Sequence, residues 1–216
     1  MTSLDPDRRA SSIACVGVLA VQGAFERHAD VLNAIGVRAR LVRSPSDFEG
    51  LRGLVLPGGE SSVQLAMIDR LGLEAPLCAL LLSGTPVLAT CAGVVLLAAK
   101  VASPEQRSLR AVDVDVTRNA WGRQQDSFEA TSDGGRPLVF IRAPRITRIG
   151  AGVRVLDRFR GEPVLVESGN VTCATFHPEL TDDDSLHRRL FLPPLPSIRA
   201  PYIQGTPHRG YEAARR

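Results

Sequence analysis

The fold is decided by the stretch PVLATCAGVVLL, residues 86–97. A short apolar run ends, a single thiol follows at Cys91, and small residues lead into a second apolar run. This pattern predicts a buried strand over Val87–Ala89, a sharp turn, and a helix over Ala92–Lys100. A cysteine at such a turn projects from a sheet edge next to a helix N-terminus, where unpaired N–H groups and the helix dipole favour thiolate over thiol. The geometry is that of a nucleophile elbow, so Cys91 is the candidate for covalent chemistry.

Strands and helices alternate through the first half of the chain. Buried strands are predicted over Cys15–Val21, Val37–Val42 and Leu54–Leu56, and helices over Phe25–Ile35, Ser62–Leu71 and Pro76–Leu82. This order predicts an α/β fold of three layers, in which an open, mostly parallel sheet carries helices on both faces.

The second half of the chain has short strands separated by glycine turns. Strands are predicted over Ala111–Thr117, Leu138–Ile141, Val153–Arg158, Pro163–Glu167 and Val171–Phe176, and a closing helix over Ser185–Phe191. Because short turns connect neighbouring strands in opposite directions, we expect the sheet to continue here with some antiparallel strands.

Length and composition fit one globular domain or at most two small ones. The chain has 216 residues, of which 44% are hydrophobic, and a chain of this size can bury roughly 70% of its unfolded surface. We expect a flexible leader over residues 1–12 and a folded domain over residues 13–191. A tail over residues 192–216 follows, in which five prolines and four arginines replace any periodic pattern.

Charge and cysteine usage exclude several classes of protein. The formal charge of +3 is carried entirely by the tail, and a neutral body argues against a nucleic-acid partner. There is no secretory segment or long apolar run, so no membrane partner is expected. The four cysteines do not form C-x-x-C pairs, which indicates a reduced cytoplasmic protein without a metal site.

A cysteine nucleophile needs a base and a group that orients the base. His177 follows the apolar strand Val171–Phe176, so it lies at the carboxyl edge of the sheet, the edge at which Cys91 also lies. Pro178 favours an extended backbone at His177, and in an extended segment residues two apart point the same way. Glu179 can therefore reach the imidazole and fix its tautomer. The expected set is Cys91 as nucleophile, His177 as base and Glu179 as orienter.

A glycine-rich loop is predicted at the same edge. Gly58 and Gly59 follow the strand Leu54–Leu56 and allow close approach of a ligand, so their N–H groups are candidate oxyanion donors. Glu60 and Ser61, next in the chain, are candidates for holding polar groups of a substrate. Two arginines, Arg118 and Arg142, each follow an apolar strand, and either could pair bidentately with a carboxylate.

The remaining cysteines and histidines have structural interpretations. Cys15, Cys78 and Cys173 lie in apolar runs and are expected to pack as small hydrophobic residues. His28 is expected on a solvated helix face, and His187 and His208 at the surface.

Six stretches together resemble the class I (triad) glutamine amidotransferases, and within them the family of glutaminase subunits of pyridoxal 5′-phosphate synthase. They are GVLAVQGAF (17–25), LPGGES (56–61), TCAG (90–93), RNAWGRQQDSFE (118–129), VFIRAP (139–144) and FHPELT (176–181). The last of these and TCAG carry the triad and indicate only a glutaminase. The stretches 118–129 and 139–144 are what point to this subfamily.

The resemblance implies a flavodoxin-like fold and a glutaminase domain over residues 13–191. It implies hydrolysis of L-glutamine to glutamate and ammonia through a thioester on Cys91, with neither metal nor cofactor. Residues at positions that hold glutamine in the family are Gly59, Glu60, Ser61, Arg118, Ile141 and Arg142. Gln22 matches a contact with the partner, a (β/α)₈-barrel synthase subunit that is usually dodecameric, implying a 12 + 12 assembly in which the glutaminase is activated by docking.

Two departures from the family pattern keep alternatives open. Ala89 occupies the position two residues before the nucleophile where glycine is usual, and the tail after Phe191 matches nothing in the family. One alternative is a catalytically silent regulatory subunit. Another is a glutaminase serving a different synthase, such as that of histidine biosynthesis. A cysteine protease of the same sheet type is disfavoured, because such enzymes tend to place histidine beside the nucleophile, where this chain has Ala92.

Overall fold

The computed structural model describes residues 15–121 and 127–192. The predicted leader over residues 1–12 and the tail from residue 193 lie outside these ranges, as do residues 122–126 of the stretch RNAWGRQQDSFE.

The main sheet has seven strands in the order β10-β11-β12-β4-β3-β1-β2. The strands are β1 (Cys15–Leu19), β2 (Arg38–Val42), β3 (Leu51–Leu56), β4 (Val87–Thr90), β10 (Arg154–Phe159), β11 (Glu162–Ser168) and β12 (Val171–Ala174). The five strands from β12 to β2 are parallel, whereas β10 and β11 extend the sheet antiparallel. The predicted open, mostly parallel sheet with later antiparallel strands is confirmed.

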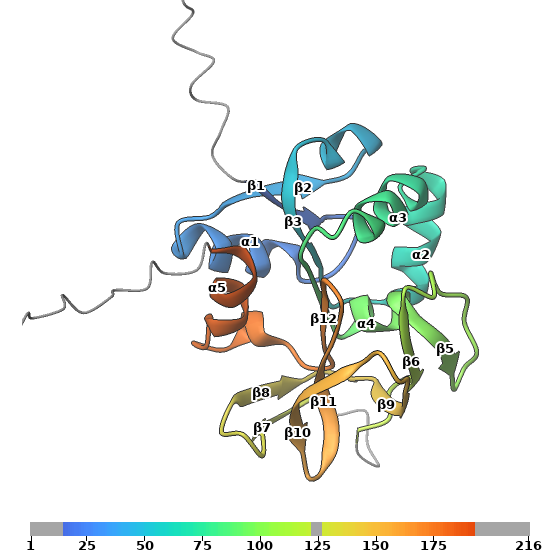
Figure 1. Cartoon of the computed structure of the whole chain (residues 1–216), viewed down its shortest axis with the longest axis vertical. Coiled ribbons are helices and arrows are strands. Elements are labelled where there is room, and N and C mark those ends of the chain that lie inside the picture. Colours follow the sequence, from blue (N-terminus) through green and yellow to red (C-terminus); the bar gives the residue numbers. More distant parts are fainter. Residues whose placement is uncertain (1–14, 122–126, 193–216) are drawn as a thin grey trace, which may run out of the picture.

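In the described residues, five α-helices cover the two faces of this sheet (Figure 1). One face carries α1 (Phe25–Ala34) and α5 (Ser185–Phe191); the other carries α2 (Ser61–Arg70), α3 (Glu74–Leu82) and α4 (Ala92–Leu97). Short 3₁₀ turns, η2 (Pro45–Phe48) and η3 (Pro178–Leu180), complete the helical segments. The predicted three layers are therefore present. Among the described residues, no helix is both long and apolar enough to cross a membrane.

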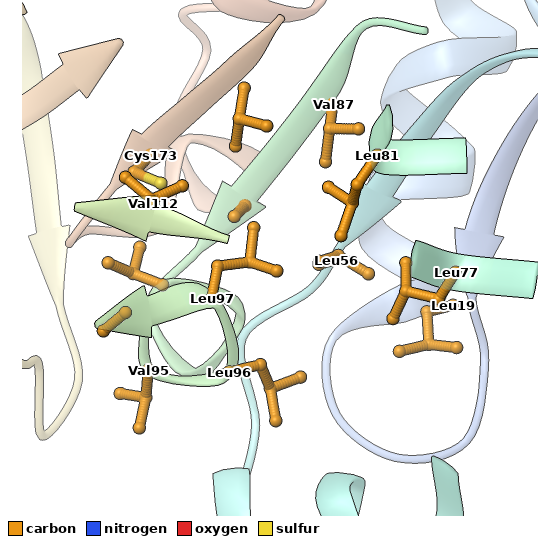
Figure 2. Packing of buried hydrophobic residues seen from close by; sticks show 14 of the residues in the cluster. Leu19, Leu56, Leu77, Leu81, Val87, Val95, Leu96, Leu97, Val112 and Cys173 are labelled. Carbon is orange, nitrogen blue, oxygen red and sulfur yellow. The ribbon is translucent and has the colours of Figure 1, made fainter. Parts of the chain in front are cut away.

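A separate hydrophobic core fills each side of the sheet. On the α2, α3 and α4 side, leucines and valines from strands and helices interlock, including Leu56, Leu77 and Leu97 (Figure 2). On the α1 and α5 side, Leu32 and Phe191 pack against strand residues. Burying a side chain of this size is worth roughly 1.5–3 kcal/mol, so these contacts fix the central strands that end at the site.

Contrary to expectation, not all strands of the second half join the main sheet. The segments β5 (Ala98–Ala102), β6 (Val112–Thr117) and β9 (Arg145–Ile149) form one small sheet, and β7 (Phe128–Thr131) and β8 (Pro137–Phe140) form another. The helix predicted over Ala92–Lys100 is wrong at its end, because α4 stops at Leu97. The chain then turns extended at Ala98 to pair with β6, since strand pairing outweighs a weak local helix preference.

Candidate active site

The nucleophile elbow joins β4 to α4. Cys91 adopts φ 45° and ψ −102°, a left-handed conformation that costs a non-glycine residue on the order of 1–3 kcal/mol. Its N–H donates to the carbonyl oxygen of Ala174 at 2.9 Å, which holds the turn against the end of β12. A side chain at Gly93 would overlap the backbone oxygen of Leu56, so glycine lets α4 pack directly on β3.

Ala89, the departure from the family pattern, is fully buried in β4. Its methyl group packs in the core on the α4 side of the sheet. Cys91 keeps its left-handed turn with this methyl group in place.

His177 lies beside the elbow, three residues after β12 ends. Strand β12 pairs with β4 in register Ala174 to Thr90, and the His177 N–H donates to the carbonyl oxygen of Val139 at 2.9 Å. The imidazole is 5% exposed, and its Nε2 atom has no hydrogen-bond partner in the described part of the chain. Burial lowers the pKa of His177, but the neighbouring Cys91 sulfur and the Glu179 carboxylate raise it more, to about 10. The site therefore favours an imidazolium beside the cysteine.

Glu179 orients the imidazole from a 3₁₀ turn. Its Oε1 accepts a hydrogen bond from His177 Nδ1 at 2.7 Å. We expected an extended segment here, but Pro178 instead starts η3, since proline is well suited to the first position of a helical turn. Burial raises the pKa of the buried Glu179 carboxyl, while His28 and His177 lower it more, so the group is held as a carboxylate.

The glycine loop is fixed by a second loop, residues 20–24. The Ala24 N–H donates to the Gly58 carbonyl at 2.9 Å, and the Glu60 N–H donates to Gln22 Oε1 at 2.8 Å. A side chain at Gly58 would overlap the imidazole of His177, so this glycine makes room for the base. The N–H groups of Gly58 and Gly59 donate to no acceptor in residues 15–121 and 127–192.

A small pocket of about 170 Å³ opens in front of the cysteine. Both positive and negative side chains line it. Arg118 pairs with Glu60 at 2.5 Å, and Arg142 lies 3.9 Å from the same carboxylate. Burial raises the pKa of Glu60, but Ser62 and the two arginines lower it by more, so the pKa is lower than usual. The Cys91 thiol donates to the carbonyl oxygen of Ile141 at 3.7 Å. All the residues predicted from the sequence except Glu179 line this pocket, namely Gln22, Gly58, Gly59, Glu60, Ser61, Cys91, Arg118, Ile141, Arg142 and His177.

Gln64, His28 and His187 have structural roles that differ from those expected from the sequence. Gln64 is fully buried, and its Nε2 donates to the carbonyl oxygens of Gln22 at 3.0 Å and Pro57 at 3.1 Å, which joins the two loops. His28 and His187 were expected at the surface, but both are 0% exposed. The signal was present: His28 lies on the stripe of α1 that includes Leu32, and Gln64 on the stripe of α2 that includes Ile68.

Cys15, Cys78 and Cys173 do not line this pocket. Burial raises the pKa of Cys173 to about 12, and burial together with Glu74 raises the pKa of Cys78, so both thiols stay protonated. Within the described ranges, no three histidine, cysteine or acidic side chains are grouped so as to hold a metal ion.

Similarity to known proteins places this chain in a family. A family profile described as the SNO glutamine amidotransferase family matches residues 18–195, a span that contains the whole pocket. The chain belongs to this family. It is 43% identical over 179 residues to pyridoxal 5′-phosphate synthase subunit PdxT of Thermotoga neapolitana, covering 80% of this chain and 95% of that protein. It is 46% identical over 187 residues to the protein of the same name from Cutibacterium acnes, covering 80% and 93%.

Two solved structures are similar to this chain to different degrees. A crystal structure described as a glutamine amidotransferase superposes with a TM-score of 0.77 at 42% identity, covering 81% of this chain and 96% of that one. Another glutamine amidotransferase, from Thermotoga maritima, superposes with a TM-score of 0.54 at 13% identity, covering 77% and 76%. The second likeness is one of fold alone.

Proposed function

We propose that this chain is the glutaminase subunit of a pyridoxal 5′-phosphate synthase, hydrolysing L-glutamine and passing the ammonia to its partner. The observation that carries the proposal is the placement of Cys91 and His177 on a small pocket with charged side chains, with Glu179 accepting a hydrogen bond from the His177 ring. Relatives more than 40% identical that bear the name of that subunit support the choice of synthase.

The reaction proceeds through a covalent intermediate on Cys91. The thiolate attacks the side-chain amide carbon of glutamine, and the oxyanion meets the N–H groups of the glycine loop. The His177 imidazolium protonates the departing nitrogen, which leaves as ammonia and yields a glutamyl thioester. His177 then accepts a proton from water, which attacks the thioester and releases glutamate. Glu179 holds the ring throughout, and the cysteine sulfur, the imidazole and the attacking water account for every proton and electron pair in these steps.

The charged groups of the pocket fit the two ends of an amino acid. Arg118 and Arg142 can pair with the α-carboxylate of glutamine, and Glu60 and Ser61 with its polar groups. Glu60 holds both arginines in the structure, so substrate and Glu60 share these cations. Ile141 and Gly59 also line the pocket, next in the chain to Arg142 and Glu60.

The partner in this proposal is a (β/α)₈-barrel synthase subunit, in a 12 + 12 assembly. Gln22 belongs to the contact with this partner. Its Oε1 already accepts the Glu60 N–H, so docking at Gln22 acts directly on the glycine loop. All four cysteines are free, as is usual in a reducing compartment, and we therefore assign the complex to the cytoplasm.

Glutamate release tests this function. The chain is mixed with L-glutamine and the barrel synthase subunit, and glutamate is measured in a coupled assay. We expect turnover that depends on the barrel subunit. Binding of the chain to the glutaminase-dependent synthase of histidine biosynthesis, and not to the barrel subunit, would instead support a different amidotransferase. Failure to turn over glutamine with either partner would support a silent subunit.

Arg118→Ala is expected to raise the KM for glutamine at least about 10-fold with little change in kcat, because hydrogen bonds to charged groups are worth about 1.5–3 kcal/mol. Steady-state kinetics of the complex measure both constants. Arg148→Ala is the matched control, since Arg148 is also ion-paired, to Asp113 and Asp115, but lies outside the pocket. An unchanged KM in Arg118→Ala would remove Arg118 from the binding site.

A further inference from the structure

Two buried histidines lie behind the orienting carboxylate. His28 comes from α1 and His187 from α5, helices that lie side by side on one face of the sheet (Figure 1). His28 Nδ1 is 3.0 Å from His187 Nε2. On its other side, His28 Nε2 is 3.1 Å from Thr90 Oγ1 and 3.3 Å from Glu179 Oε2. The contacts form a continuous chain from His187 through His28 and Glu179 to His177.

Both histidines are held neutral. Burial is the largest effect on each; it lowers the pKa of His28, and, with His28 nearby, it lowers the pKa of His187 to about 4. Glu179 is ionised, as described above. The chain of contacts therefore contains two imidazoles with one N–H each and one buried carboxylate.

Proton counting selects one tautomer for His28. The Oε2 atom of Glu179 is buried and accepts no hydrogen bond from the described residues, and His28 Nε2 lies 3.3 Å from it. If His28 carried its proton on Nδ1, the lone pair of Nε2 would face this negative oxygen at 3.3 Å, a repulsive contact in a buried site. With the proton on Nε2, the N–H lies between the Glu179 carboxylate and the Thr90 hydroxyl.

The His28 tautomer in turn selects the tautomer of His187. His28 Nδ1 becomes an acceptor, and the His187 Nε2–H is the donor that it faces at 3.0 Å. The opposite tautomer of His187 would aim two lone pairs at each other and leave a buried N–H on Nδ1, which has no partner in the described part of the chain. Leaving an acceptor rather than an N–H unpaired is the less costly arrangement.

We propose that His28 is a positioning residue of the glutaminase, donating from Nε2 to the second oxygen of Glu179, and that His187 holds His28 in the required tautomer. Fixing both carboxylate oxygens leaves Oε1 aimed at His177 and keeps the imidazole facing Cys91. The bond to Thr90 extends the arrangement to the residue that precedes the nucleophile. The catalytic consequence rests on the proposed function, whereas the hydrogen-bond pattern does not.

Two variants of His28 separate positioning from packing. His28→Leu removes the donor, and we expect kcat of the complex to fall about 10-fold with KM within twofold, as for other residues that orient a catalytic group. His28→Gln places an amide N–H near the former Nε2 position and should recover most of this loss. Leu32→Ala is the matched control, because Leu32 is equally buried on the same helix but does not contact the carboxylate. Equal losses in the two His28 variants, or a loss no larger than that of Leu32→Ala, would overturn the proposal.

Nitrogen NMR of the unaltered chain tests the hydrogen-bond pattern without any variant or partner. With ¹⁵N-labelled histidine at neutral pH, we expect His28 and His187 to be neutral and both protonated on Nε2. A proton on His28 Nδ1, or a charged His28, would overturn the proposal. A wild-type complex that does not hydrolyse glutamine would contradict the proposed function, while this spectrum would still decide the tautomers.

Discussion

Replacing Cys91 with alanine is expected to lower glutamine hydrolysis by about 10⁴-fold or more, the scale seen when a nucleophile of a catalytic triad is removed. Alanine has no atom that can form the thioester, and the left-handed turn remains in place for the N–H groups around it. The measurement is glutamate release by the complex with the barrel subunit. Cys78→Ala is the matched control, since Cys78 is a partly exposed thiol outside the pocket.

Covalent labelling gives an independent reading of the same residue. A diazo-ketone analogue of glutamine should modify Cys91 in the complex and leave the Cys91→Ala protein unmodified. Full hydrolytic activity in Cys91→Ala, or labelling at another cysteine, would exclude the thioester mechanism.

Gly58→Ala is expected to lower kcat on the order of 10²-fold, because a misplacement of about 1 Å at a reacting group has an effect of this size. The new methyl group would overlap the imidazole of His177 and push the base away from Cys91. The kcat of the complex measures the effect. The fold should survive, because the imidazole lies at the pocket wall and can rotate toward the open space.

The matched control for Gly58→Ala is Gly152→Ala, where a methyl group meets no atom within 4 Å. Its kcat and thermal stability are expected to equal those of the wild type. If Gly58→Ala kept full activity, the imidazole would not occupy the space that the glycine leaves.

Local patterns in the sequence were enough for the central fold and most of the pocket. The alternation of apolar runs and helices placed β1 to β4, and the residue order around Cys91 placed the elbow. Because the carboxyl ends of parallel strands lie at one edge of a sheet, His177 and the glycine loop could also be predicted to lie beside Cys91. The strands, the elbow and the glycine loop can be predicted because each is formed by a short continuous segment of the chain.

Features that depend on tertiary partners could not be predicted from local patterns. Strand β5 forms only because β6 lies beside Ala98, in a stretch that locally continues a helix. The spacing of His28 and Leu32 on α1 indicates a shared buried face, but the contact of His28 with His187 across two helices depends on the tertiary structure. The pairing of Gln22 with Glu60 likewise joins residues 38 apart in the chain.

The hydrogen bond from the Cys91 N–H to Ala174 has a consequence for how the molecule can lose activity. Nucleophile and base are spaced by the register of β4 on β12, two central strands whose side chains fill the core, so they separate only when the whole sheet opens. The glycine loop at the rim is held by only a few bonds from residues 22, 24 and 64 and can rearrange far more easily. Partial unfolding should therefore impair substrate binding first, while Cys91 and His177 keep their relative positions until global unfolding.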